Sequence, residues 1–384
     1  MRTPRGHLGP RGVRTGRTLG RPTPGSASAS AHGAHAHEED VVDLRSTPGL
    51  GRLYAAGVLG SARAAAGGLV ASVGASGRAT LTVAPEDLPR TRLRLDGVAP
   101  DADHLTAYQH LLGEPAGDVL PAGFLHVMAF PVALALMVRS DFPLPLLGMV
   151  HVANRIEQQR AVRLGELLGV SVHPQDLSEH RAGVTVDVVA EITVDEVVVW
   201  QGVSTYLSKG VRLAGAPRRA ADEASHGAEA DEVQQGGHGD AASRSDDGDQ
   251  ASPAQRRPTL EPPMPTGQWR LPADVGRRYA AVSGDRNPIH LSTLAAKAFG
   301  FPRTIAHGMY TAARALADVG SARGESFVWE VEFGKPVLLP STVAVRVAED
   351  DAGPGYGFVV WDARRGRLHL SGRVTPLTSG HPAG

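Results

Sequence analysis

Residues 279–309 hold a carboxylate and an imidazole at a spacing suited to acid–base chemistry. Asp285 and His290 lie five residues apart, and the segment continues through a short apolar stretch to His307 and Met309. A carboxylate and an imidazole are side chains that can jointly hold and activate one water molecule. The spacing therefore makes Asp285 and His290 the candidate catalytic residues. A capping Asp and a packed His are the structural alternative, which these residues alone leave open.

The turn between the two candidates is expected to fix the direction of their side chains. Gly284 is predicted to end a helix, and the pair Asn287–Pro288 to prevent that helix from restarting. Asn287 would orient the loop or hydrogen-bond the pair, or simply form an Asx turn before the proline. Ser283 and His307 are expected to support rather than react. No nucleophile-elbow pattern surrounds Ser283, which disfavours a Ser–His–Asp hydrolase.

Gly308 is the candidate donor for a developing negative charge. It is expected near the beginning of an apolar helix, where backbone N–H groups are unpaired and the helix dipole favours an anion. A glycine also lets a substrate approach the backbone closely. The alternative is a glycine that only allows close packing of a helix against a sheet.

Two folded modules are predicted, residues 46–213 and 264–378, in an α+β fold. Each has a helical stretch, a long apolar helix and then strands with period-two alternation. In the second module we expect helices at 272–282 and 305–319, and strands at 327–333, 342–348, 357–362 and 367–376. In the first module we expect a long helix at 124–138 and strands at 147–152, 183–193 and 196–207.

Segments of biased composition flank these modules. Residues 1–45 are predicted to be a disordered basic arm, since the first 37 residues hold six arginines and no acid. Residues 214–263 are predicted to be an acidic, low-complexity linker that buries too little apolar area to fold, and 379–384 a short tail. A metal site at His32, His35 and His37 of the arm is not expected, because no ordered surroundings are predicted there.

Composition excludes several classes of function. The chain has 384 residues, 42% of them hydrophobic, and a net charge of −1 at pH 7. A nearly neutral chain has no positive field that would attract nucleic acid. The sequence also contains no apolar run of about 18 residues, so we expect no membrane-spanning helix. Without cysteine there can be no disulfide, thiolate metal site or cysteine nucleophile. We therefore expect a cytoplasmic enzyme that binds no nucleic acid.

The two modules look like copies of one another. Residues 108–114 match 279–285 in spacing, and 124–128 resemble 305–309. Glu114 would then correspond to Asp285, and His126 to His307. The first module is shorter by about the segment that would carry a counterpart of His290. It is therefore predicted to keep the fold and to have lost the chemistry.

The segment from Tyr279 to Met309 resembles the signature of the MaoC-like (R)-specific enoyl-CoA hydratases and 3-hydroxyacyl thioester dehydratases. The resemblance implies a double hot dog, in which each module wraps an antiparallel sheet around a long central helix. It implies reversible hydration of trans-2-enoyl-CoA to (3R)-3-hydroxyacyl-CoA in fatty-acyl metabolism, by Asp285 and His290, with the Gly308 N–H on the thioester carbonyl. The substrate would be an acyl-CoA or acyl-carrier thioester, with no metal or other cofactor, and a homodimer is compatible with the family.

Three other functions remain open. A dehydratase of fatty-acid or polyketide synthesis would differ only in the thiol carrier, and a hot-dog thioesterase would share the fold. A non-catalytic acyl-thioester binding subunit belongs to another class and would bind without turnover. Five basic residues are candidate contacts for carrier phosphates, although such charges are usually only solvated surface: Arg277, Arg278, Lys297, Arg303 and Lys335.

Overall fold

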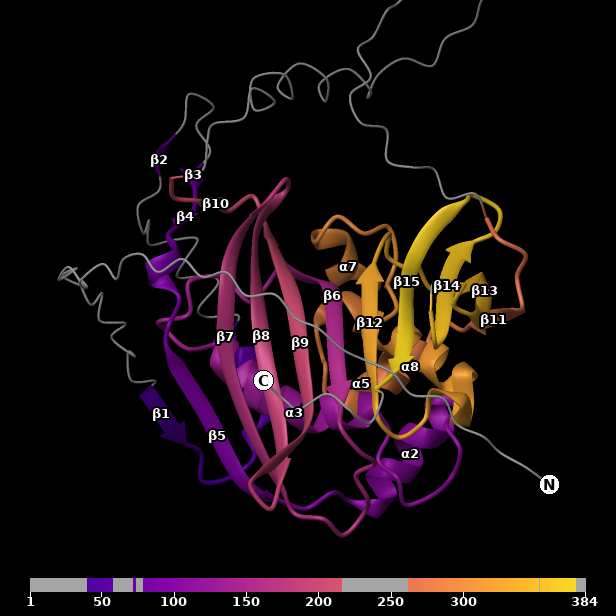
Figure 1. Cartoon of the computed structure of the whole chain (residues 1–384). Helices are drawn as coiled ribbons and strands as arrows, with labels where there is room; N and C mark the ends of the chain where they lie inside the picture. The colour runs from indigo at the N-terminus through magenta and orange to yellow at the C-terminus, as the bar shows by residue number, and fades with distance from the viewer. Residues whose placement is uncertain (1–39, 58–71, 74–78, 216–261, 352, 378–384) are drawn as a thin grey trace, which may run out of the picture. The chain divides into compact units, whose positions relative to one another are not determined.

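The two halves of the chain fold with the same order of elements (Figure 1). The computed structural model describes residues 40–57, 72–73, 79–215, 262–351 and 353–377. In the N-terminal half the main elements are β5 (Thr91–Val98), α2 (Ala102–Leu112), α3 (Ala122–Met137), β6 (Met149–Gln158), β7 (Leu168–His180), β8 (Gly183–Val194) and β9 (Val197–Lys209). In the C-terminal half they are β11 (Gly267–Leu271), α5 (Val275–Ser283), α6 (Pro288–Leu291), α7 (Thr293–Ala298), α8 (Gly308–Val319), β12 (Phe327–Phe333), β13 (Ser341–Glu349), β14 (Tyr356–Asp362) and β15 (Arg367–Pro376).

Smaller elements complete the described chain. Residues 50–57 are helical. The remaining elements are β1 (Asp40–Asp43), β2 (Ser72–Val73), β3 (Ala79–Thr80), β4 (Thr82–Val83), β10 (Arg212–Leu213) and the 3-10 turns Pro85–Asp87 and Gly320–Arg323.

One sheet runs through both halves. Its order among the described residues is β1-β5-β7-β8-β9-β6-β12-β15-β14-β13-β11. With the short edge strand β1 set aside, each half has five strands in the sheet, and from the outer edge inward they follow the order first, third, fourth, fifth, second. The halves meet where β6 and β12 pair antiparallel, with Gln158 opposite Phe327 and Ala153 opposite Glu332. The two halves therefore have the same strand order and pair through equivalent strands, which confirms the predicted internal repeat.

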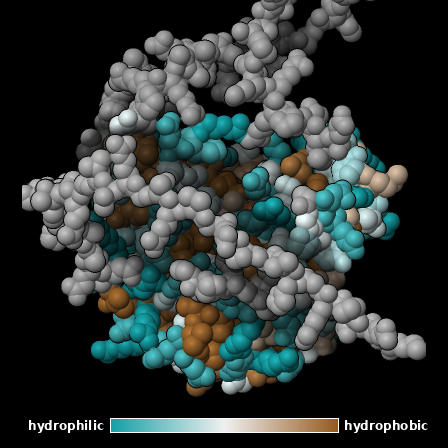
Figure 2. All heavy atoms as spheres, in the orientation of Figure 1, coloured by the Kyte–Doolittle hydropathy of each residue, from teal (hydrophilic) through white to brown (hydrophobic). Residues whose placement is uncertain are grey.

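The two long helices pack against this sheet. Helix α3 contacts β7 and β8, and α8 contacts β13 and β15. Helix α3 is apolar almost all round, as expected for a helix buried on most sides, and buries Phe124, Leu125 and Leu134. Helix α8 buries small residues such as Ala312 and Ala315, which let it lie close to the strands. Hydrophilic side chains are interspersed with hydrophobic ones on the face shown in Figure 2.

The sequence predictions of fold class and of most elements are confirmed, including the α+β double hot dog. Strands β12 and β15 have the predicted bounds, whereas α8 begins at Gly308 instead of residue 305. Strands β5, β7 and β11 were not predicted. Asp40–Asp43, placed within the basic arm by composition, forms β1 and pairs parallel with β5. The rest of the arm, residues 216–261 of the linker, the tail and the three arm histidines lie outside the described residues.

Candidate active site

The turn that carries Asp285 and His290 is built differently from the prediction. Helix α5 ends at Gly284, whose φ of 73° is the left-handed conformation that glycine adopts without strain. The helix does restart, because Pro288 is the first residue of α6, a position where its fixed φ and missing N–H are favourable. The Asn287 side chain caps this one-turn helix by accepting a hydrogen bond from the Ile289 N–H. The expectation that Asn287–Pro288 would prevent a new helix is therefore wrong, and His290 is held on a helix.

His290 is buried, and its orientation is fixed by one hydrogen bond. Its Nδ1 lies 2.9 Å from the Ile305 carbonyl oxygen. A carbonyl can only accept, so Nδ1 carries the proton and Nε2 is left as the basic nitrogen. Burial lowers the pKa of His290, although the Asp285 carboxylate and the Ile305 carbonyl partly oppose this. The ring is therefore neutral at neutral pH and can accept a proton at Nε2.

Asp285 is held by donors on one of its oxygens. Its Oδ1 accepts hydrogen bonds from the Tyr54 hydroxyl at 2.7 Å and from the Asn287 N–H at 3.1 Å. Burial raises the pKa of Asp285, but His307, His290 and these two donors outweigh it, so the pKa lies below its usual value. Asp285 is thus a carboxylate at neutral pH.

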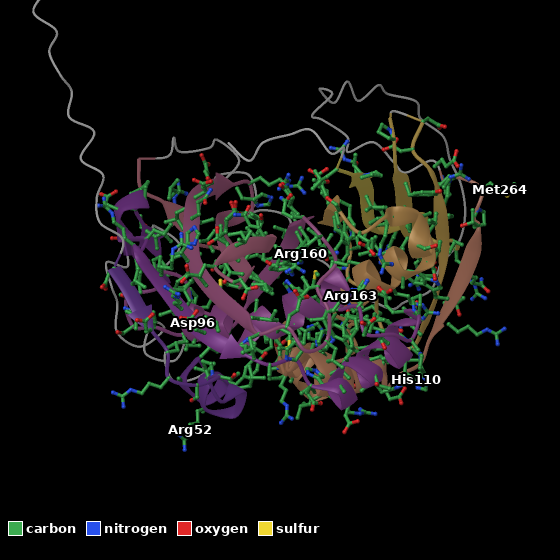
Figure 3. All side chains as sticks on the ribbon, turned by 60° about the horizontal axis from the view of Figure 1, so that its bottom comes forward. Arg52, Asp96, His110, Arg160, Arg163 and Met264 are labelled. Atoms are coloured by element: carbon green, nitrogen blue, oxygen red, sulfur yellow. The ribbon has the colours of Figure 1, made fainter. Side chains whose placement is uncertain are left out.

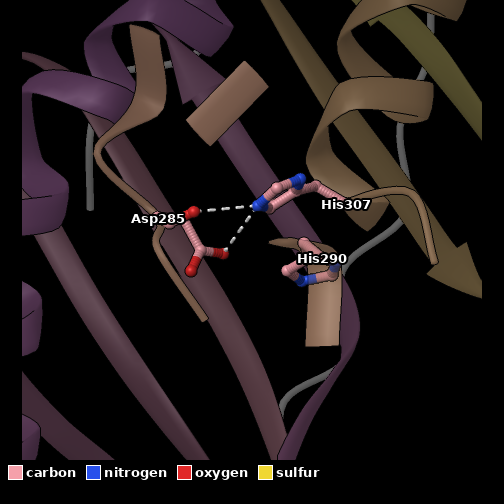
Figure 4. A group of neighbouring side chains, drawn as sticks. All are labelled: Asp285, His290 and His307. Atoms are coloured by element: carbon pink, nitrogen blue, oxygen red, sulfur yellow. Dashed lines mark hydrogen bonds and ion pairs between the residues drawn. The ribbon is translucent and has the colours of Figure 1, made fainter. Parts of the chain in front are cut away.

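His307 supports both candidate residues (Figure 4). Its Nε2 donates to the Asp285 backbone carbonyl at 3.0 Å and lies 3.7 Å from Oδ2 of the same residue. Its ring stacks on His290 with centroids 3.6 Å apart. Burial, and next the neighbouring His290, lower the pKa of His307 to about 3. The neutral ring therefore holds the turn through the Asp285 backbone and lies beside the Asp285 carboxylate.

Ser283 and Thr311 add two small polar groups. Ser283 Oγ accepts from the Asp285 N–H at 3.2 Å, which ties Ser283 to the turn. Thr311 is buried in α8, and its hydroxyl donates to the Gly308 carbonyl at 2.7 Å. Sequence reasoning missed Thr311 because only the apolar residues after it stood out.

Gly308 is the first residue of α8, so its N–H has no partner within the helix. A Cβ at this position would lie 2.9 Å from Cε1 of Phe333, closer than real Cβ contacts. The aromatic ring therefore occupies the space that any larger side chain would need, and Gly308 lines the same pocket as Asp285 and His290.

One pocket collects these groups with residues of the N-terminal half. Apolar residues of α3 line one part of it: Val127, Phe130, Leu134 and Met137. Polar residues of the same half also reach it: Tyr54, His126, His151 and Tyr206. Of the five basic candidates, Lys335 lines the pocket and the other four do not.

The described residues of the N-terminal half contain no second copy of the site, but the sequence correspondence needs correction. Before each long helix the chain forms an equivalent contact, Leu120 N–H to the Val162 carbonyl and Ala306 N–H to the Val337 carbonyl. By this pairing His307 corresponds to Pro121, so matching His307 to His126 was wrong. The chain between Glu114 and α3 is too short to hold a counterpart of α6 or α7.

Glu114, the counterpart of Asp285, has a structural role. Its carboxylate is buried and pairs with Arg323 of the other half at 2.9 Å. Arg323 also donates to the Leu316 carbonyl of α8. The retained carboxylate therefore links the halves.

Asp285, His290 and His307 also have the composition of a metal site, with ligand-type atoms within 4.8 Å of one another. The two imidazole planes, however, are stacked within 24° of parallel, so their nitrogen lone pairs do not converge on one point. Nδ1 of His290 and Nε2 of His307 are moreover engaged with carbonyls. The arrangement suits hydrogen bonding to water better than tetrahedral coordination.

Comparison with known proteins assigns the family. A model of the MaoC-like domain matches residues 249–356, which include the whole candidate turn. Over 304 residues the chain is 33% identical to 3-hydroxyacyl-thioester dehydratase X of Mycobacterium tuberculosis, spanning 79% of this chain and 95% of that one. The chain belongs to the MaoC-like dehydratase family.

Two further comparisons agree with this membership. The chain is 35% identical over 94 residues to 3-hydroxybutyryl-CoA dehydratase of Methylorubrum extorquens, which is 23% of this chain and 55% of that one. The crystal structure of HtdX of Mycobacterium tuberculosis superposes with a TM-score of 0.58 and 30% identity, covering 74% of this chain and 100% of that one. This MaoC-like chain therefore matches a relative across both halves. None of the helices in its described part is long and apolar enough to cross a bilayer.

Proposed function

We propose that this chain catalyses the reversible hydration of trans-2-enoyl thioesters to (3R)-3-hydroxyacyl thioesters. The observation that carries the proposal is the convergence of an ionised carboxylate and a neutral imidazole on one small space. A carboxylate oxygen of Asp285 and a ring nitrogen of His290 lie within 4.8 Å of each other, a separation that a single water can bridge. Family membership supports the same reaction type.

The reaction follows from the proton positions. A water between Asp285 Oδ2 and His290 Nε2 would donate to both acceptors and present an oxygen lone pair to C3 of the enoyl group. As the C3–O bond forms, the water loses one proton to the pair, and one proton is delivered to C2. Because so close a pair titrates as a unit, the proton transfers are assigned to the pair jointly.

The Gly308 N–H would stabilise the thioester oxygen as negative charge develops on it. Its position at the first residue of α8 adds the favourable end of the helix dipole. The hydrogen bond from Thr311 to the Gly308 carbonyl ties the next peptide, Gly308–Met309, to the first turn of the same helix.

The apolar stripe of α3 supports a place for the acyl chain. Pocket-lining residues recur from His126 to Met137, a span of about 16 Å at 1.5 Å per residue. An acyl group directed along this stripe would be buried against Phe130 and Leu134. The exposed Lys335 lines the same pocket and suits a phosphate of the thiol carrier, CoA or carrier protein.

The test is hydration of crotonyl-CoA and longer trans-2-enoyl-CoAs, with chiral analysis of the product. Asp285→Asn and His290→Gln are each expected to lower kcat by about 100- to 10,000-fold, because each removes one partner of the water. Leu294→Ala, at an exposed residue of α7, is the matched control. Near-normal turnover in both site variants would overturn the proposal, and thiol release from saturated acyl-CoA would point to a thioesterase instead.

Location and assembly are part of the proposal. The cysteine-free sequence suits the reducing cytoplasm. A homodimer of double hot dogs is tested by light scattering of the purified chain.

A further inference from the structure

The short helix at residues 50–57 packs directly on the catalytic turn. Leu50 touches Gly284, so that a Cβ at this glycine would clash with the Leu50 side chain. Arg52 of the same helix is exposed and points away from the body of the structure (Figure 3). The helix thus has one face on the turn and one face in solvent.

Tyr54, on the packed face, makes two hydrogen bonds to this turn. Its hydroxyl donates to Asp285 Oδ1 at 2.7 Å and accepts from the Arg286 N–H at 2.9 Å. The hydroxyl therefore binds both the side chain and the backbone of the segment that carries the catalytic carboxylate. Burial, and next Asp285, raise the pKa of Tyr54, so the hydroxyl keeps its proton at neutral pH and acts as a donor.

The two carboxylate oxygens of Asp285 have different surroundings. Oδ1 receives the Tyr54 hydroxyl and the Asn287 N–H. Oδ2 lies on the side of His307, at 3.7 Å, and is left for the water. Without Tyr54, the carboxylate could rotate and exchange its oxygens, and it would lose a donor that favours the ionised form.

We propose that Tyr54 is a positioning residue for the catalytic carboxylate, so that the active site is built by both halves of the chain. The inference rests on the proposed hydratase function. It changes the role of the N-terminal half, which supplies a hydrogen-bond donor to the reaction centre in addition to a wall of the pocket. Sequence position gives no hint of this contact, since 231 residues separate the two partners.

The test is Tyr54→Phe, which keeps the ring and removes the hydroxyl. We expect kcat for crotonyl-CoA to fall about 10- to 100-fold, the effect of losing one hydrogen bond to a charged group, with KM changed less than about threefold. The acid limb of the kcat/KM profile should move to higher pH, because a donor that lowers the pKa of Asp285 has been removed. The other titratable groups facing Asp285 stay unchanged in this variant: His126, His151, Tyr206, Tyr279, His290 and His307.

Two controls separate the possible failures. Arg52→Ala alters the solvent face of the same helix and should leave kcat and the pH profile unchanged. Tyr54→3-fluorotyrosine keeps the shape and makes the hydroxyl a stronger donor, so it should move the acid limb to lower pH even if Tyr54→Phe folds poorly. A wild-type kcat and pH profile in Tyr54→Phe, or an unmoved profile with fluorotyrosine, would overturn the positioning role. Failure of the hydratase proposal itself would appear separately, as no hydration of any trans-2-enoyl-CoA by the unsubstituted protein.

Discussion

Three histidines around the pocket, of which His307 is buried and His126 and His151 are partly buried, make stability depend on pH. Burial, the leading cause for each, lowers the pKa of His126 to about 4 and those of His151 and His307 to about 3, from an ordinary 6.5. Between pH 6.5 and about 4 the unfolded chain therefore binds protons that the folded chain does not. These three histidines contribute a constant amount to the free energy of unfolding above pH 7. Their contribution falls as the pH is lowered from 6.5 to about 4.

We predict that His126→Gln flattens this dependence. An amide does not titrate, so the slope of unfolding free energy against pH between 6.5 and 4.5 should decrease by about 1.4 kcal/mol per pH unit at most. Urea unfolding at several pH values measures it. An unchanged slope would mean that His126 is protonated in the folded protein. His104→Gln, at a histidine that bonds the Val282 carbonyl outside the main pocket, is a useful comparison.

Single residues of the site were predictable to the extent that local sequence determines them. Asp285, His290 and Gly308 could be proposed from sequence because they lie in one short segment, with a turn and a helix start, that resembles a known signature. Tyr54 could not be found, since its contact depends on tertiary packing and the residues beside it carry no motif. The same limit explains His126, whose entry into the pocket follows from the placement of α3.

At the scale of elements, the position of His290 depends on how closely α5 and α6 approach. A Cβ at Gly276 of α5 would clash with the backbone carbonyl oxygen of His290. Glycine in a helix costs up to about 1 kcal/mol relative to alanine. Glycine at this position therefore costs helix stability and allows α5 to lie against the backbone of His290.

We predict that Gly276→Ala lowers kcat by at least about tenfold, because His290 must shift away from the water. Steady-state hydration of crotonyl-CoA measures this. Ala281→Gly, at an exposed position of the same helix, should cost up to about 1 kcal/mol of stability and leave kcat unchanged. A more stable and fully active Gly276→Ala would show that α6 does not need the close approach.

Elements were predictable where alternation was clean. Strands β12 and β15 were predicted at their bounds, and apolar and polar side chains alternate over residues 329–333 in β12 and over residues 367–371 in β15. Strand β7 was missed because Pro174 and the polar residues after it interrupt its pattern. Pro174 is tolerated there since β5 pairs with β7 only as far as Val172, which leaves the proline N position without a ladder partner on that side. Strand order was beyond local sequence, because pairing is set by contacts far apart in the chain.

At the scale of the molecule, Glu114 and Arg323 form a buried ion pair between the halves, with side chains only 3% and 14% exposed. Removing one partner leaves a buried charge without compensation. We predict that Arg323→Leu destabilises the protein by about 3–5 kcal/mol, and that Arg323→Leu with Glu114→Leu recovers most of this loss.

Chemical denaturation of the two single variants and the double variant measures the coupling. The exposed pair Arg373 and Glu330 provides the control, since exposed ion pairs contribute about 1 kcal/mol or less. Equal losses in the double variant and in Arg323→Leu would contradict a buried, mutually dependent pair.

The pairing of β6 with β12 has a consequence for stoichiometry. Each half covers a strand edge of the other through backbone hydrogen bonds, which any two such halves could form regardless of side chains. As separate polypeptides, the halves could therefore pair with copies of themselves, and a C-terminal half so paired would lack Tyr54. Because the two halves belong to one chain, every C-terminal half pairs with an N-terminal half and so receives Tyr54.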